Sequence, residues 1–173
     1  MPYLRTIIDK NQLEEKPAPI KPVINVPPHI PTTYRYSDVK GGLLSTKNLT
    51  ASEKGEKYED YVGSLYKELN YHVIHEGRLK HRWDGSIDLI CQYEIYTTLV
   101  QCKYYDRPNA RIDVTDIYKF YGAVKYYSLK HLKEVVIGAF WTSLQGNSCA
   151  KAHDIATDLG IFFYEGVFIY ERQ

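Results

Sequence analysis

The pattern of apolar and polar residues from Thr50 onward predicts a long amphipathic helix. Thr50-Ala51-Ser52-Glu53 has the T-x-x-E form of a capping box, so the helix is expected to begin there. Its apolar and aromatic positions recur at about 100° per residue, as on one buried stripe. They are Tyr58, Tyr61, Val62, Leu65, Tyr66 and Leu69.

After Asn70 the pattern changes to short runs rich in β-branched and aromatic residues. The expected strands are 71–75, 87–91, 97–103, 135–141, 161–164 and 167–170, and the further helices are 113–129 and 148–159. This order, αβββαβαββ, predicts an α/β fold with a mixed central sheet flanked by helices.

Prolines mark a boundary in the chain of 173 residues, because seven of the eight precede residue 32. Proline fixes φ and has no N–H, which makes such a stretch a poor helix or central strand. We expect residues 1–49 to form a proline-rich extended arm or linker that docks a protein partner. Residues 50–173 are then long enough for one folded domain.

Charge and cysteine content narrow the class of protein. The 22 Lys and Arg nearly balance the 21 Asp and Glu, so any affinity for nucleic acid must come from a local basic patch. No apolar run reaches the roughly 18 residues that cross a bilayer, and no membrane partner is expected. Three cysteines without CxxC spacing indicate an intracellular protein, cytoplasmic if the source is a prokaryote or a phage.

Three acids on the first helix differ in their angular position. Glu59 lies about 90° from the centre of the apolar stripe, whereas Glu56 and Asp60 lie about 150° or more away. Only Glu59 therefore borders the buried face. Gly55 and Gly63 lie one turn before and after it, which leaves room for a backbone or a ligand. A solvated carboxylate beside two incidental glycines fits the same pattern.

Asp88 interrupts the apolar run of its predicted strand. A buried carboxylate without a partner costs several kcal/mol, so a compensating group is expected. On strand 97–103, alternation puts Gln101 and Lys103 on one face of the sheet and Cys102 on the other.

A hairpin between these two strands would supply the partner. With its turn centred between Glu94 and Ile95, position 88 lies opposite position 101, because the midpoint of those two numbers falls between 94 and 95. Asp88, Gln101 and Lys103 then share one surface patch, with Lys103 diagonal to Asp88.

Two chemical interpretations fit this patch. One is a structural pair of Asp88 and Lys103 on a partly exposed strand. The other is a site for a hard metal ion, because carboxylates and a carbonyl oxygen suit Mg²⁺ and a neighbouring lysine can orient a water molecule. The residues alone leave both open.

Basic residues gather beside the patch in the sequence. Arg78, Lys80 and Arg82 precede it and Arg107 follows it, and such groups hold phosphate backbones. Tyr104 adds a flat aromatic surface on which a base could stack. Packing in the core with the hydroxyl at its edge is the alternative, and the residues favour it over stacking.

Three short motifs, taken together, resemble the Mrr-like branch of the PD-(D/E)xK nuclease superfamily. They are Gly55-x-x-x-Glu59, Asp84-Gly85-Ser86-Ile87-Asp88-Leu89-Ile90 and Gln101-Cys102-Lys103, and the resemblance covers about residues 50–165. It implies a restriction-endonuclease-like αβββαβ core. Ser86 departs from the glycine usual in that branch. The neutral Gln101 replaces the acid of other branches, a substitution that the Mrr-like branch shares.

The resemblance also implies roles for individual residues. Asp88 would be the main metal ligand, Gln101 and Glu59 would complete a Mg²⁺ site that Mn²⁺ can also occupy, and Lys103 would position the attacking water. The implied activity is a restriction-like, Mg²⁺-dependent DNA endonuclease, and double-strand cleavage by so small a domain calls for a homodimer. The alternatives are a catalytically inactive nucleic-acid-binding or scaffolding module of the same fold and a Holliday-junction resolvase.

Overall fold

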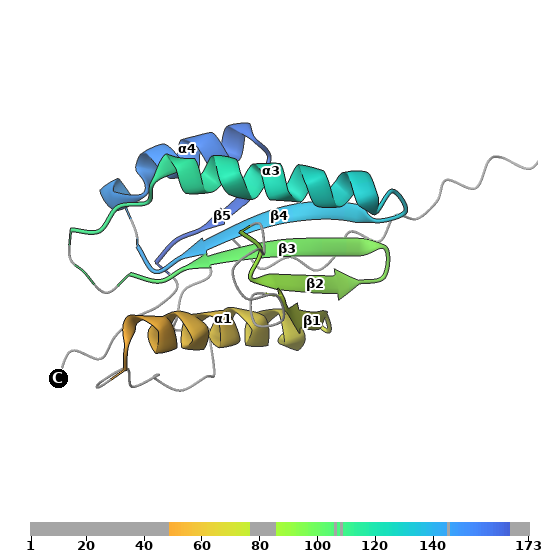
Figure 1. Cartoon of the computed structure of the whole chain (residues 1–173), viewed down its shortest axis with the longest axis horizontal. Helices are drawn as coiled ribbons and strands as arrows, with labels where there is room; N and C mark the ends of the chain where they lie inside the picture. The colour runs from red at the N-terminus through yellow and green to blue at the C-terminus, as the bar shows by residue number, and fades with distance from the viewer. Residues whose placement is uncertain (1–48, 77–85, 106, 108, 145, 167–173) are drawn as a thin grey trace, which may run out of the picture.

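A mixed β-sheet organises the part of the chain that the computed structural model describes, which is residues 49–76, 86–105, 107, 109–144 and 146–166 (Figure 1). The elements in chain order are α1 (Ala51–Glu68), β1 (His72–His75), β2 (Leu89–Tyr93), β3 (Tyr96–Lys103), α3 (Val114–Lys130), β4 (Val135–Thr142), the 3₁₀ turn η2 (Gly146–Ser148), α4 (Ala150–Asp158) and β5 (Phe162–Tyr164). The expected α/β class and αβββαβ order are confirmed.

The sheet has the strand order β1-β2-β3-β4-β5. Strands β1, β2 and β3 pair antiparallel, whereas β3, β4 and β5 pair parallel. Parallel neighbours need a crossover connection, and α3 and α4 supply the two crossovers. The carboxyl ends of β3 and β4 therefore lie at one edge of the sheet, together with the N-terminal ends of α1 and α3 (Figure 1).

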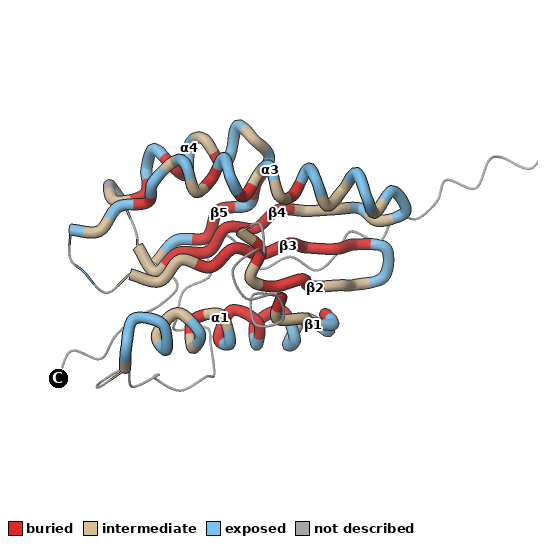
Figure 2. The backbone as a smooth tube through the Cα atoms, viewed as in Figure 1, coloured by how far each residue is buried: buried red, intermediate tan, exposed pale blue. Residues whose placement is uncertain are grey.

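Helices cover both faces of the sheet. Helix α1 lies on one side, and α3 and α4 lie on the other (Figure 1). Figure 2 shows burial concentrated on the central strands and on the helix faces turned toward them. The cluster on the α1 side includes Tyr58, Val62, Leu65, Leu89, Val100, Cys102 and Trp141. The cluster on the α3 side includes Ile90, Leu99, Ile117, Phe120, Phe140 and Phe163.

The hairpin of β2 and β3 has the predicted register. Leu89 lies opposite Val100 and Tyr93 lies opposite Tyr96, so the chain reverses between positions 94 and 95. Glu94 has a φ of 53°, a left-handed conformation that allows the short reversal.

The limits of β2 differ from the expected strand 87–91. Gln92 and Tyr93, which lie beyond the expected strand, are half-buried and paired with β3, so the strand runs two residues further and begins two residues later. Asp88 consequently precedes the strand and does not interrupt it. Its main-chain N–H still donates to the carbonyl of Val100, over 2.8 Å.

Side-chain caps fix the starts of the two long helices. The predicted capping box is present in α1, where the Thr50 N–H donates to Glu53 Oε2 at 2.7 Å and the Glu53 N–H donates to Thr50 Oγ1 at 3.3 Å. In α3, Asp113 Oδ1 accepts the Thr115 N–H at 2.9 Å. Such caps satisfy backbone donors that a helix start otherwise leaves unpaired, so both helices begin at defined points beside the edge of the sheet.

Two other expectations have different outcomes. The helix expected at 148–159 is α4 at Ala150–Asp158, because Gly146–Ser148 form a 3₁₀ turn first and Cys149 precedes the helix. The strand expected at 167–170 and the arm at 1–48 lie outside the described residues, so the division into arm and domain stays a prediction. In the described ranges, no helix has the length and apolar character required to span a bilayer.

Two glycines give a matched test of how α3 packs on the sheet. A Cβ at Gly138 of β4 would lie 3.1 Å from Val124 Cγ2 and 3.5 Å from Phe120, whereas one at the exposed Gly122 of α3 would meet nothing within 4 Å. Gly138→Ala should therefore lower the free energy of unfolding by about 1 kcal/mol through overpacking. Gly122→Ala should raise it by about 0.5–1 kcal/mol through helix propensity. Urea unfolding measures both, and equal effects of the two changes would contradict the packing described.

Candidate active site

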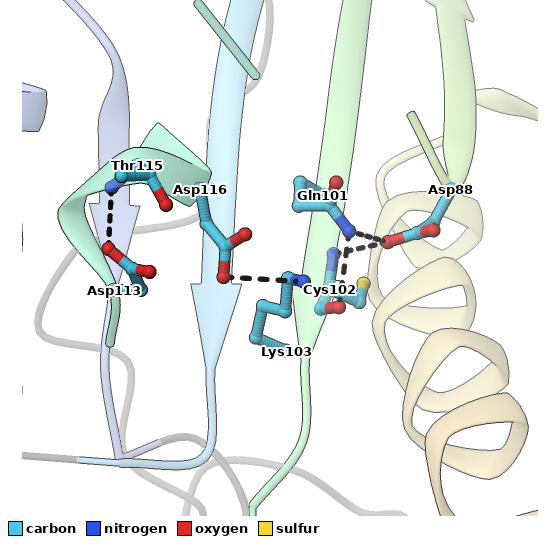
Figure 3. Close-up of polar contacts among 7 residues, drawn as sticks. All are labelled: Asp88, Gln101, Cys102, Lys103, Asp113, Thr115 and Asp116. Atoms are coloured by element: carbon cyan, nitrogen blue, oxygen red, sulfur yellow. Dashed lines mark hydrogen bonds and ion pairs between the residues drawn. The ribbon is translucent and has the colours of Figure 1, made fainter. Parts of the chain in front are cut away.

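Asp88 is anchored at the point where β2 begins. Its Oδ2 accepts a hydrogen bond from Gln101 Nε2 at 2.5 Å and another from the main-chain N–H of Cys102 at 2.6 Å (Figure 3). The half-buried carboxylate is thus compensated by donors on β3. The predicted meeting of positions 88 and 101 is confirmed, and the main-chain donor at Cys102 was not foreseen.

The backbone of β3 explains why that donor is present. The carbonyl of Lys103 accepts from Ser143 N–H at 3.2 Å, so the backbone groups of residue 103 point toward β4. Backbone groups alternate in direction along a strand, and those of Cys102 therefore point toward the β2 side. Since β2 does not extend that far, Asp88 replaces a strand partner there. The main-chain carbonyl of Cys102 faces the same edge and is a candidate metal ligand.

Gln101 is buried, with 6% of its surface exposed. Its amide nitrogen contacts Asp88 and lies 3.4 Å from the Cys102 carbonyl oxygen. The side chain thus presents its donor to the carboxylate. A half-turn about its last torsion exchanges nitrogen and oxygen, and would present the carbonyl oxygen that a hard metal ion requires.

Lys103 is paired with an acid that the sequence analysis did not single out. Its Nζ lies 3.4 Å from Oδ2 of Asp116, in the first turn of α3, with the two side chains 34% and 23% exposed. Cys102 packs with the α1 cluster, so the predicted alternation of faces is confirmed. Among the described residues, the acid that forms an ion pair with Lys103 is Asp116, although the sequence suggested Asp88.

Glu59 approaches the same region from α1. It is half-buried, whereas Glu56 and Asp60 are exposed, as the angular pattern predicted. Burial, followed by the negative charges of Asp88 and Glu59, raises the pKa of the Cys102 thiol well above its ordinary value of 9.0. Both carboxylates thus lie close enough to act on one thiol.

The two glycines beside Glu59 differ in what surrounds them. A Cβ at Gly63 would touch side chains of β1, at 3.5 Å from Val73 and 3.6 Å from His75, so that space is filled by protein. A Cβ at Gly55 would meet nothing within 4 Å. The close neighbour at Gly63 is therefore strand β1, and the approach of a ligand beside Gly55 stays a prediction.

Ser86 has a φ of 69°, in the left-handed region that glycine adopts without strain. The resemblance placed a glycine at this position, and the conformation gives that preference a physical reason. Serine keeps the conformation here at a modest cost in strain.

The proposed nucleic-acid contacts are only partly covered by the structure. Arg78, Lys80 and Arg82 lie outside the described residues. Arg107 is exposed, which suits a phosphate contact. Tyr104 is half-buried, with its ring centroid 5.7 Å from that of Tyr58, which favours its role in packing. The binding roles of these residues stay predictions.

The oxygen atoms at this edge of the sheet suit a hard cation. Carboxylates of Asp88 and Glu59 and carbonyl oxygens at positions 101 and 102 are the ligands that Mg²⁺ prefers, and Mg²⁺ keeps several waters of its own. Among the residues described, no three His, Cys, Asp or Glu side chains form a metal-binding group. A cation here would therefore depend on two acids and neutral oxygens.

The raised pKa of Cys102 predicts how stability depends on pH. Because its folded-state pKa lies above the unfolded value near 9.0, this thiol contributes stability that is complete below that pH and lost above it. Between pH 9 and pH 10.5, stability should fall less steeply in Cys102→Ala than in the unaltered protein, by up to about 1.4 kcal/mol per pH unit. Urea midpoints across this range measure the slopes, and identical slopes would contradict the prediction.

The family model Mrr_cat, described as "Restriction endonuclease", matches residues 50–156. This segment includes Glu59, Asp88, Gln101 and Lys103. No curated protein and no solved structure gives a significant match.

Proposed function

The chain belongs to the Mrr_cat restriction endonuclease family, and from this membership we propose that it is a Mg²⁺-dependent DNA endonuclease that hydrolyses phosphodiester bonds. The observation that most supports the proposal is the anchored carboxylate of Asp88, held by Gln101 and the Cys102 amide. Lys103 follows two residues after Gln101 on the same face of β3. An acid, an amide and an ammonium thereby lie on neighbouring strand ends.

The acids and carbonyl oxygens have the role of metal ligands in this proposal. Asp88 and Glu59 would hold Mg²⁺, or Mn²⁺ in its place, with the Gln101 side-chain carbonyl after its half-turn and the Cys102 main-chain carbonyl. The ion supplies Lewis-acid stabilisation of charge on a phosphoryl oxygen. The hydrogen bonds to Asp88 keep the carboxylate in place before substrate arrives, which reduces the reorganisation needed at the site.

Lys103 has the role of positioning water. Its ammonium carries three donors, and one donor directed at Asp116 leaves two for a water molecule and a phosphoryl oxygen. The water then attacks phosphorus while the bond from phosphorus to the leaving oxygen breaks in line with it. The proton of the water passes to solvent, and the leaving oxygen takes a proton from solvent. Holding both reactants in this way converts a bimolecular encounter into a step within one complex.

DNA is the proposed substrate, bound through its phosphates by Arg78, Lys80, Arg82 and Arg107, with Tyr104 at the edge of the surface. Cleavage of both strands would require two copies of the chain, one for each strand, related by a twofold axis. The arm at residues 1–49 is proposed to dock a protein partner.

One observation favours a second candidate function. The amide of Gln101 is neutral, and the described residues hold no group of three acidic or other metal-binding side chains. A site with few negative charges binds Mg²⁺ weakly, which fits a catalytically inactive module that binds nucleic acid. Metal-dependent cleavage separates the two functions.

Removal of single charges should separate cutting from binding. Asp88→Asn and Lys103→Ala should each lower the rate of plasmid nicking with Mg²⁺ or Mn²⁺ by at least about 100-fold, because each removes a group that acts on the reacting phosphate. DNA affinity in a gel-shift assay should change little. Glu59→Gln should reduce cutting, whereas Glu56→Gln on the exposed side of the same helix should not.

If the unaltered protein binds DNA but fails to cut it with every divalent ion tested, the inactive module is the correct function. Faster cleavage of four-way junctions than of linear duplex would identify a junction resolvase instead.

A Gln101→Glu variant tests the cation site without relying on activity. The new carboxylate would lie within hydrogen-bond distance of Asp88, and repulsion should lower the free energy of unfolding by about 1–3 kcal/mol without divalent ions. Added Mg²⁺ should raise Tm more in this variant than in the unaltered protein, since binding stabilises the folded state. Gln92→Glu, the same change on the neighbouring strand β2, should show no such Mg²⁺ dependence. Equal responses in all three proteins would argue against a cation at Asp88.

A further inference from the structure

We propose that Asp116 is a positioning residue for Lys103, which it holds at the end of β3 in the place where the lysine orients water. The inference rests on the proposed function and adds a residue to it. It starts from the ion pair of 3.4 Å between Lys103 Nζ and Asp116 Oδ2. Both side chains are about one-quarter to one-third exposed, so the pair is partly shielded from solvent and still open to a substrate.

The carboxylate of Asp116 is carried by a rigid element. Asp113 caps α3, and the Asp116 N–H donates to the Asp113 carbonyl at 2.9 Å. The next residue, Ile117, is fully buried against the sheet, as is Phe120 one turn later. An acid in the first turn is also favoured by the helix dipole. Asp116 therefore has a fixed position relative to β3 and β4.

The backbone of Lys103 is equally fixed. Lys103 is the last residue of β3, pairs with Thr142 of β4, and accepts the Ser143 N–H at 3.2 Å. Its long side chain is nevertheless flexible, and a free ammonium would sample many positions. An anion at a fixed place restricts the ammonium to the few positions that keep the ion pair.

The direction of the restraint matters for the chemistry. Figure 3 shows Lys103 between Asp116 on one side and the contacts of Asp88, Gln101 and Cys102 on the other. This agrees with the place of β3 between β2 and β4 in the sheet. Asp116 thus holds the ammonium from the β4 side, and the proposal directs the donors of the ammonium toward water and substrate on the other side.

The opposite role is also chemically possible, because a carboxylate could withhold Lys103 from the substrate until DNA displaces it. The two roles predict opposite kinetics. A positioning residue speeds the reaction, so its loss lowers kcat. A withholding residue slows the reaction, so its loss raises kcat.

The first experiment compares plasmid nicking by Asp116→Asn and Asp113→Ala with that of the unaltered protein. Asp116→Asn should lower kcat about 10- to 100-fold and change KM for DNA less than about twofold, because it removes orientation and leaves binding intact. Asp113→Ala weakens the start of the same helix but keeps the carboxylate at position 116, so it should lower stability and reduce kcat less than Asp116→Asn does. Adding Asp116→Asn to Lys103→Ala should cause no further loss, since the acid acts only through the lysine.

The second experiment needs neither metal nor DNA. In the full-length protein, acylation by an amine-reactive ester is followed by mass spectrometry at Lys103, with the exposed Lys151 of α4 as an internal standard. Asp116→Asn should increase labelling of Lys103 about two- to fivefold, which is the range expected for loss of a partly exposed ion pair. Labelling of Lys151 should not change.

Each outcome decides between the proposals. If the unaltered protein cuts DNA and Asp116→Asn has an equal or higher kcat, the positioning role is overturned and the endonuclease stands. Unchanged labelling of Lys103 in Asp116→Asn also overturns the role, because the acid would then not hold the lysine. If the unaltered protein cuts under no condition, the proposed function fails, and the role of Asp116 in it fails too.

Discussion

The candidate site depends on one side chain, the carboxylate of Asp88, which accepts a backbone hydrogen bond in place of a neighbouring strand. Strand β3 extends past the start of β2, which leaves the Cys102 N–H directed at an edge where none of the described strands pairs with it. A buried N–H without an acceptor is costly, and the Asp88 carboxylate takes the place of the missing strand. The same carboxylate then needs a further donor, and Gln101 supplies it. Satisfying the backbone thus fixes an acid at the edge of the sheet.

The placement of helices α1 and α3 brings Glu59 and Asp116 to this edge of the sheet. The parallel pairing of β3 and β4 places the start of α3 beside the end of β3, and the start of α1 lies at the same end of the molecule (Figure 1). Glu59 therefore arrives from one side of the sheet and Asp116 from the other. The two clusters of buried residues hold these helices on opposite faces of the sheet. Glu59 and Asp116 therefore each keep a fixed position relative to the strand that carries Lys103.

The sequence predicted those features that depend on local pattern. The capping box located the start of α1, the apolar stripe separated Glu59 from its exposed neighbours, and the midpoint of the hairpin gave the register that joins Asp88 to Gln101. The end of β2 at Tyr93 depends on the short turn that the left-handed backbone of Glu94 allows, and no residue pattern predicts that conformation. Asp116 was missed because its motif, Asp113-x-x-Asp116, looks like ordinary capping of a helix. Only the crossover from β3 to β4 places it beside Lys103.

The most direct test of the central claim, that Asp88 and its neighbours form a cation site, is a crystal structure of the protein with Mn²⁺. The anomalous difference map should show a peak within about 2.5 Å of an Asp88 carboxylate oxygen. Carbonyl oxygens of position 101 or 102 should complete its ligands, and the Asp88 contact to the Cys102 amide should persist. A map without a peak at saturating Mn²⁺, or an Asp88 side chain turned away from β3, would contradict the account.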